Sequence, residues 1–213
     1  MPRFDHQLAR VAQTATAIAR AGEISALCSD RNARQQWTLA RLESLYELAF
    51  LRVFASWEMC LEGILYRTLC GYSLTTGQEA LCSGGYHSTL GSAESAVLAA
   101  FGGSRGAAFL LWHDPHKVIK RCQRFVSSGT QETILTSNVA RLEHISRTRH
   151  RIVHDSLDAK NKFDSATRGL VGTVYPRSRP GKFLRDLDVT NPRPKRWLET
   201  IANELVGLLK QMV

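Results

Sequence analysis

The sequence lacks the features that mark a secreted or membrane-spanning protein. Its N-terminus, Met-Pro-Arg-Phe-Asp-His, has no basic segment followed by an apolar run, so it does not predict a secretory signal. The longest apolar stretch, Leu45 to Leu69, is interrupted by charged side chains and does not predict a membrane span. We therefore expect a cytoplasmic protein with no membrane partner.

Paired cysteines and common cofactor motifs are also missing. The five cysteines are odd in number and include no Cys-x-x-Cys pair, so neither a disulfide framework nor a cysteine-rich zinc site is indicated. No Gly-Lys-Ser/Thr follows the Gly-Gly pairs, which excludes a phosphate loop. We expect neither a cofactor nor a metal ion.

What the chain does have is ordinary globular composition and helical periodicity. Hydrophobic residues make up 44% and charged residues 22% of the 213 residues, so one domain over residues 1–213 can bury a core. Apolar residues recur at helical spacing, which predicts an all-α bundle with a long central helix. The expected helices run over about 5–27, 34–69, 92–101, 115–126, 137–154 and from 192 to the C-terminus. Asp114-Pro115 and Asn191-Pro192 are typical helix starts. The last helix has an apolar stripe that consists of Trp197, Ile201, Leu205, Leu208 and Met212.

Two regions between the helices need separate interpretation. Residues 73–130 are rich in Gly, Ser and Thr near their start and predict a loop-rich insertion in a simpler bundle. Residues 157–190 predict a basic linker, and within it Leu170 to Tyr175 and Lys182 to Leu184 can pair as a small β-hairpin near 170–184.

The positive charge is concentrated in one segment. The formal net charge is +9, from 28 basic and 19 acidic residues, and the fifty residues from Arg147 to Arg196 hold 13 of those basic and 5 of those acidic residues. Such a segment predicts a polyanionic partner. The alternative is a solvated basic surface that only aids solubility.

The helix that ends near His154 carries an arginine in its apolar face. On an ideal helix Arg149 falls near the middle of the arc formed by its apolar residues. That arc contains Val139, Leu142, Ile145, Ile152 and Val153. A buried, unpaired guanidinium costs several kcal/mol. Arg149 is therefore expected to pair with an acid, for which Glu58 is the candidate, or to face a cleft or a second subunit.

The residues Arg149-His150-Arg151-Ile152-Val153-His154 resemble the signature of the HEPN superfamily (higher eukaryote and prokaryote nucleotide-binding domains), namely arginine, a polar residue, any three residues and histidine. Ala55 to Glu58 with Leu61 and Glu62 is similar to the family's long earlier helix. The resemblance implies a HEPN-like helical bundle and a metal-independent endoribonuclease, often a toxin or an antiviral defence component. It also implies a homodimer with a composite site, and an antitoxin or a defence-system protein as a further partner.

Carried over to this chain, the resemblance makes Arg149 and His154 the catalytic pair and puts His150 at the polar position, most often asparagine in the family. The chemistry suits these residues, because histidine titrates near neutrality and arginine binds phosphate through two donors. RNA is the expected substrate, with its own 2′-hydroxyl as nucleophile. The basic side chains expected to bind it are Arg147, Arg151, Arg193, Lys195 and Arg196.

Other interpretations stay open at this point. The chain can be a catalytically silent HEPN-like module that binds RNA or a nucleotide or docks a partner protein, or a scaffold without nucleic acid. His150 and His154 are four residues apart, as in helical zinc pairs, but the glutamate of the His-Glu-x-x-His pattern is missing. They can also be structural polar residues at a helix end, where cations are favoured.

Overall fold

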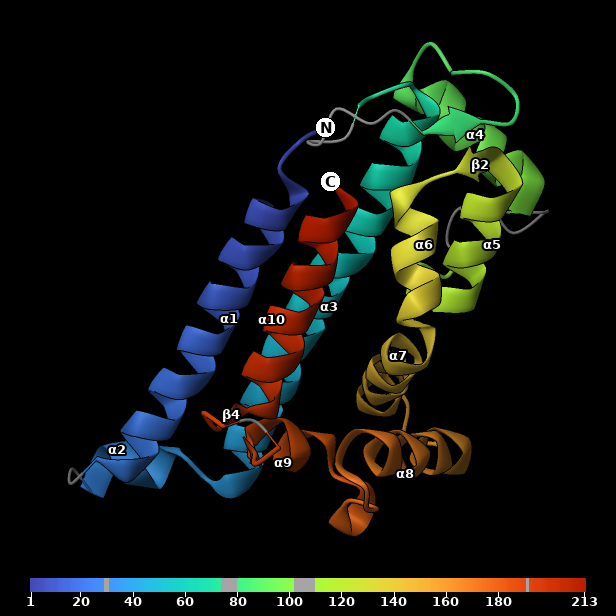
Figure 1. Ribbon diagram of the computed structural model, residues 1–213. Coiled ribbons are helices and arrows are strands. Elements are labelled where there is room, and N and C mark those ends of the chain that lie inside the picture. Colours follow the sequence, from blue (N-terminus) through green and yellow to red (C-terminus); the bar gives the residue numbers. More distant parts are fainter. Residues whose placement is uncertain (29–30, 74–79, 102–109, 191) are drawn as a thin grey trace. The chain divides into compact units, whose positions relative to one another are not determined.

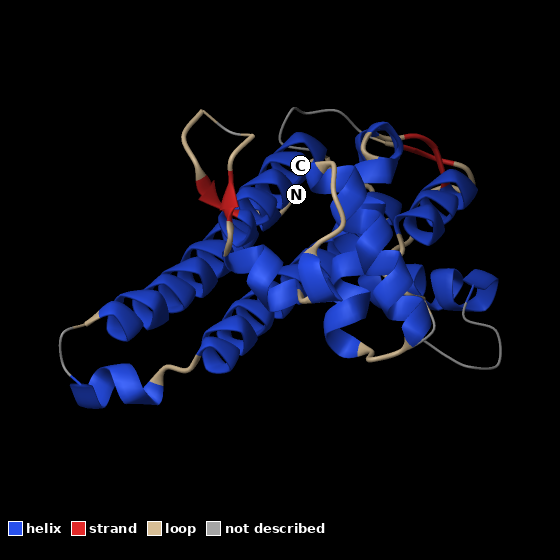
Figure 2. Cartoon of the chain, turned by 90° about the horizontal axis from the view of Figure 1, so that it is seen from below, coloured by secondary structure: helices blue, strands red, loops and turns tan. Residues whose placement is uncertain are grey.

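The computed structural model describes residues 1–28, 31–73, 80–101, 110–190 and 192–213, and this part of the chain is mostly helical, as predicted. Figure 1 shows the helices and Figure 2 the two short strand pairs. The helices are α1 (Phe4–Leu27), α2 (Arg31–Gln36), α3 (Leu39–Leu69), α4 (Leu90–Phe101), α5 (Pro115–Phe125), α6 (Thr130–Ser137), α7 (Val139–Val153), α8 (Leu157–Val171), the 3-10 turn η3 (Pro176–Ser178), α9 (Pro180–Arg185) and α10 (Trp197–Met212). The antiparallel pairs are β1 (Leu81–Cys82) with β2 (Val126–Ser128) and β3 (Leu187–Asp188) with β4 (Lys195–Arg196).

The chain divides into two compact units, and neither is continuous in sequence. Unit 1 comprises Met1–His6, Trp57–Glu143 and Gly207–Val213, and unit 2 comprises Gln7–Ser56 and His144–Val206. The described part of the predicted insertion, residues 73–130, lies within unit 1 and contains α4 and α5, whereas residues 74–79 and 102–109 of that insertion lie outside the described residues. The basic segment from Arg147 to Arg196 lies within unit 2, which therefore holds the predicted catalytic residues.

Unit 1 is built around the second half of α3, and its α5 confirms the predicted helix start. The side chain of Asp114 accepts hydrogen bonds from the backbone N–H groups of His116 (3.0 Å) and Lys117 (3.3 Å), and Pro115 occupies the first turn. Arg121 is buried at 2% exposure with its guanidinium 4.5 Å from the ring centroid of Trp112. Arg121 is therefore a buried cation of unit 1, and it is not one of the predicted site residues.

Unit 2 has an aromatic core centred on Phe183. Its ring lies 5.2 Å from that of Trp197, 6.0 Å from that of Phe163 and 5.4 Å from that of Tyr175, measured between centroids. These side chains come from α8, α9, α10 and the segment before η3.

The predicted apolar stripe of α10 is confirmed, because all of its members are buried: Trp197, Ile201, Leu205, Leu208 and Met212.

Two helix boundaries differ from the prediction for local reasons. The helix expected over 34–69 is broken into α2 and α3, since the Thr38 side chain accepts a hydrogen bond from Arg41 N (3.3 Å) and caps a new helix. The last helix begins at Trp197, because Lys195–Arg196 forms a strand, and Asn191, expected at its start, lies outside the described residues.

The predicted linker and hairpin are wrong. Residues 157–171 form α8, which begins after Ser156, whose hydroxyl accepts a hydrogen bond from Ala159 N (3.1 Å). It ends at Val171 and is followed by Gly172, whose φ of 79° suits a glycine just after a helix C-terminus. Leu170 therefore belongs to a helix, and Lys182 lies in α9, so neither is in a strand.

None of the described helices is both long enough and apolar enough to cross a membrane.

Gly181 tests whether α9 depends on close packing. A Cβ at this position would lie 2.6 Å from both Cβ and the carbonyl oxygen of Glu43, so Gly181→Ala is expected to lower the free energy of unfolding by about 1–3 kcal/mol. Gly207→Ala is the control, because no described atom lies within 4 Å of its Cβ position in α10 and the change should raise stability by about 0.5–1 kcal/mol. Urea denaturation measures both, and equal midpoints would contradict the expectation.

Candidate functional site

The predicted motif occupies the last turn of α7 and the short turn after it. α7 ends at Val153 and Ser156 caps α8, so the chain reverses within residues 154–156. His154 N donates to His150 O (2.9 Å), which keeps His154 in register with the helix. Arg147 Nη1 donates to Ser165 Oγ (3.2 Å), a contact that connects α7 with α8. Figure 1 shows α8 next to the end of α7.

The two motif histidines lie side by side. Their ring centroids are 4.6 Å apart, with an angle of 48° between the ring planes. His154 is exposed and His150 is half-buried. His150 Nε2 lies 3.8 Å from Asp158 Oδ2, and Asp158 in turn pairs with Lys162 Nζ at 2.7 Å. The site thus combines two imidazoles with a carboxylate and an ammonium group from α8.

The surroundings of His150 favour its neutral form. Burial lowers its pKa below the ordinary 6.5, and the nearby charges of His154, Lys162 and Arg149 lower it further, while Asp158 acts in the opposite direction. A neutral imidazole at physiological pH can accept a proton. His150 therefore has the protonation state that a general base requires.

Arg149 lies near the end of α7, where the side chains of its apolar face are less buried. Leu142 and Ile145 on the same side of the helix are buried, as predicted, but Arg149 is half-buried and Val153 is 47% exposed. Only Leu142 and Ile145 of the predicted apolar arc are therefore buried, and Arg149 keeps contact with solvent. Glu58, its expected partner, is half-buried and belongs to unit 1, and that pairing stays a prediction.

Arg151, expected to bind substrate, makes three hydrogen bonds within the protein. Its Nη1 donates to His154 O (3.1 Å) and to Asp155 Oδ1 (2.7 Å), and its Nε donates to Ser178 O (3.3 Å). Only 18% of its side chain is exposed. The structure thus connects this arginine to the backbone of the motif.

The other expected RNA-binding residues lie at the β3–β4 hairpin. Arg193 and Lys195 are exposed, and their contact with RNA stays a prediction. Arg196 instead pairs with Glu23 of α1, with 3.0 Å between Nη2 and Oε1. This ion pair connects β4 with α1 within unit 2.

Sequence reasoning missed Asp158 and Lys162, because it expected a linker where α8 lies. A helical signal was present, since Ala159, Phe163, Ala166 and Leu170 recur at helical spacing and are all buried. Among the described residues, no group of three or more His, Cys, Asp or Glu side chains is placed to hold a metal ion.

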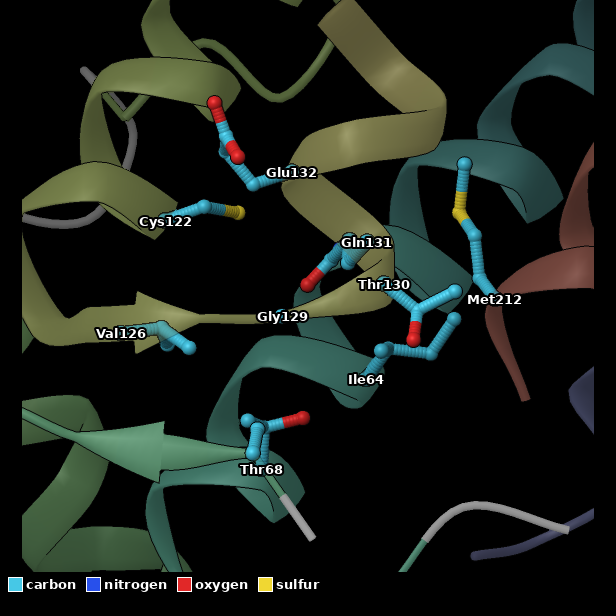
Figure 3. Close-up of a pocket in the computed structure, with 10 residues that line it drawn as sticks. Ile64, Thr68, Cys122, Val126, Gly129, Thr130, Gln131, Glu132 and Met212 are labelled. Carbon is cyan, nitrogen blue, oxygen red and sulfur yellow. The ribbon is translucent and has the colours of Figure 1, made fainter. Parts of the chain in front are cut away.

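A pocket in unit 1 offers less chemistry than the motif. It is lined mainly by α3, α5 and α6, and Figure 3 shows its side chains. Gln131 Nε2 donates to Leu61 O (2.9 Å), and Glu132 accepts hydrogen bonds from Gln123 and Thr136. Burial raises the pKa of the Cys122 thiol to about 12, so it is protonated and a poor nucleophile.

Comparison of the chain with models of known protein families, with curated proteins and with solved structures finds no match. The interpretation of the site therefore rests on its residues and their geometry.

The charges around His150 can be tested by NMR titration of its ring. His154→Gln removes a like charge and should raise the His150 pKa, whereas Asp158→Asn removes a favourable charge and should lower it. His116→Gln, at an exposed position on α5, should leave the His150 pKa unchanged. Shifts of the same sign in the first two variants would contradict the arrangement.

Proposed function

We propose that this protein is a metal-independent endoribonuclease of the HEPN type. The observation that carries the proposal is the pair of imidazoles, 4.6 Å apart at the end of α7, in which the half-buried one has a lowered pKa. Arg149 lies on the same helical turn. These groups supply a proton acceptor, a proton donor and a cation, which are what phosphodiester transfer in RNA needs.

The two imidazoles can divide the roles of base and acid. Burial lowers the pKa of His150, and a charge on the neighbouring imidazole disfavours its protonation further. His150, with the lowered pKa, accepts the proton of the 2′-hydroxyl. His154, exposed beside it, gives a proton to the departing 5′-oxygen.

Arg149 completes the reaction centre. The 2′-oxygen attacks phosphorus, the P–O5′ bond breaks, and the products are a 2′,3′-cyclic phosphate and a 5′-hydroxyl. Extra negative charge develops on the phosphorane oxygens, and a half-buried guanidinium stabilises it more than an exposed one would. The reaction depends on the 2′-hydroxyl, so DNA is not a substrate.

The proposal extends to the biological setting that the resemblance implies, a toxin or an antiviral defence component with an antitoxin or a defence-system partner. It also includes a homodimer. Val153 and Leu157 flank His154 and are 47% and 73% exposed, so a second copy covering them would place its own groups near the site.

RNA cleavage by purified variants tests the activity. His154→Ala is expected to lower the rate by about 10²–10⁴, since proton transfer to the leaving group is lost. Arg149→Ala should cause a loss of about 10²–10³ through the missing charge. His116→Ala is the control with wild-type rate, and EDTA should not slow cleavage. Binding of RNA without cleavage by the wild type would favour the silent module instead.

The homodimer has its own test. Leu157→Asp places a charge at the apolar surface beside His154 and should shift the molar mass measured by light scattering from dimer to monomer. Val189→Asp is the matched control, because Val189 is 80% exposed on the loop of the β3–β4 hairpin and should not affect the mass. A monomeric wild type would contradict the dimer.

A further inference from the structure

We infer that Arg151 is a positioning residue, which holds the backbone of His154 against the η3 turn and so keeps the two motif imidazoles together. This inference rests on the proposed function for its catalytic consequence. The geometric part concerns only contacts within unit 2.

The N–H groups of Arg151 bind acceptors within the protein, and they leave no free pair of parallel donors for a phosphate. Nη1 serves both the His154 carbonyl (3.1 Å) and the Asp155 carboxylate (2.7 Å), and Nε serves the Ser178 carbonyl (3.3 Å). Bidentate binding of phosphate needs two parallel N–H groups on one edge of the guanidinium. Each such edge of Arg151 has a donor already engaged, and only 18% of the side chain is exposed.

The acceptor at Ser178 is held in place by an unusual turn. Arg177 and Ser178 have φ values of 58° and 47°, although neither is glycine. Residues without glycine's freedom adopt this left-handed conformation at a cost of about 1–3 kcal/mol each, and such strain clusters at functional sites. The turn gives Ser178 a carbonyl that faces Arg151.

Neighbouring elements stabilise that turn on both sides. The hydroxyl of Ser178, which is 2% exposed, donates to Asp164 of α8. Arg179 donates through Nε to Glu43 Oε2 (2.9 Å), and Gly181 N donates to Glu47 Oε1 (2.9 Å), both on α3. Through Arg151, the position of His154 therefore depends on the η3 turn and on the helices α3 and α8 that bind this turn.

If Arg151 positions His154, its substitution should lower turnover and change RNA binding little. A displacement of about 1 Å in a catalytic group can lower a rate about 10²-fold. Arg151→Lys keeps the charge but cannot reach three acceptors at once, so kcat should fall about 10- to 100-fold while KM and the salt dependence of binding stay unchanged. A phosphate-binding arginine would instead raise KM and reduce the salt dependence.

The decisive measurement needs no activity. In the wild type, the ring protons of His150 and His154 should show a nuclear Overhauser effect, since the centroids are 4.6 Å apart. Arg151→Lys should weaken it. Asp164→Ala, which removes the acceptor of the Ser178 hydroxyl, should weaken it to a smaller extent. Lys160→Ala is the matched control at an exposed position of α8 and should preserve the signal.

The possible outcomes distinguish the positioning role of Arg151 from the proposed ribonuclease function. A full signal in Arg151→Lys, or a raised KM with unchanged kcat, would overturn the positioning role. If the wild type cleaves no RNA, the proposed function fails, while the signal between the two rings still decides whether Arg151 positions His154. Should Arg151→Lys not fold, Asp164→Ala supplies the same comparison against Lys160→Ala.

Discussion

The arrangement of unit 2 depends on two carboxylates of α3 that are one helical turn apart. Glu43 is buried and accepts two hydrogen bonds from Arg179, while Glu47 accepts one from the backbone of Gly181. Taking an ion pair out of water roughly offsets its attraction, so this pair adds little net stability. What it supplies is a defined place for the chain just after η3, and the contacts to α7 follow from that place.

Helices with a local signal could be predicted from the sequence. The Asp114-Pro115 start of α5 and the apolar stripe of α10 depend on residues close together in the chain, and both are confirmed. α8 was missed because two of the four buried positions named above are alanines, Ala159 and Ala166, which give a weak apolar signal. The predicted hairpin was wrong for a related reason, since Leu170 and Val171 look like a strand until the start of the helix at Ser156 is recognised.

For the candidate site too, contacts between residues close in the sequence could be predicted, and contacts between distant residues could not. His150 and His154 are neighbours because four residues make about one helical turn, which the sequence alone implies. Asp158 approaches them only because the chain reverses after α7. Two distant partners were hidden for the same reason: Ser178, which binds Arg151, lies 27 residues away in the sequence, and Glu23, which binds Arg196, lies 173 residues away. Charge alone does not reveal which cations face an acid in the folded chain.

The η3 turn combines a left-handed backbone at two residues with a carbonyl that binds Arg151. Glycine at Arg177 and Ser178 would relieve the left-handed backbone, and it would also loosen the carbonyl that Arg151 holds. The cost of this conformation falls on residues outside α7, while the carbonyl that it presents restrains the end of α7 through Arg151.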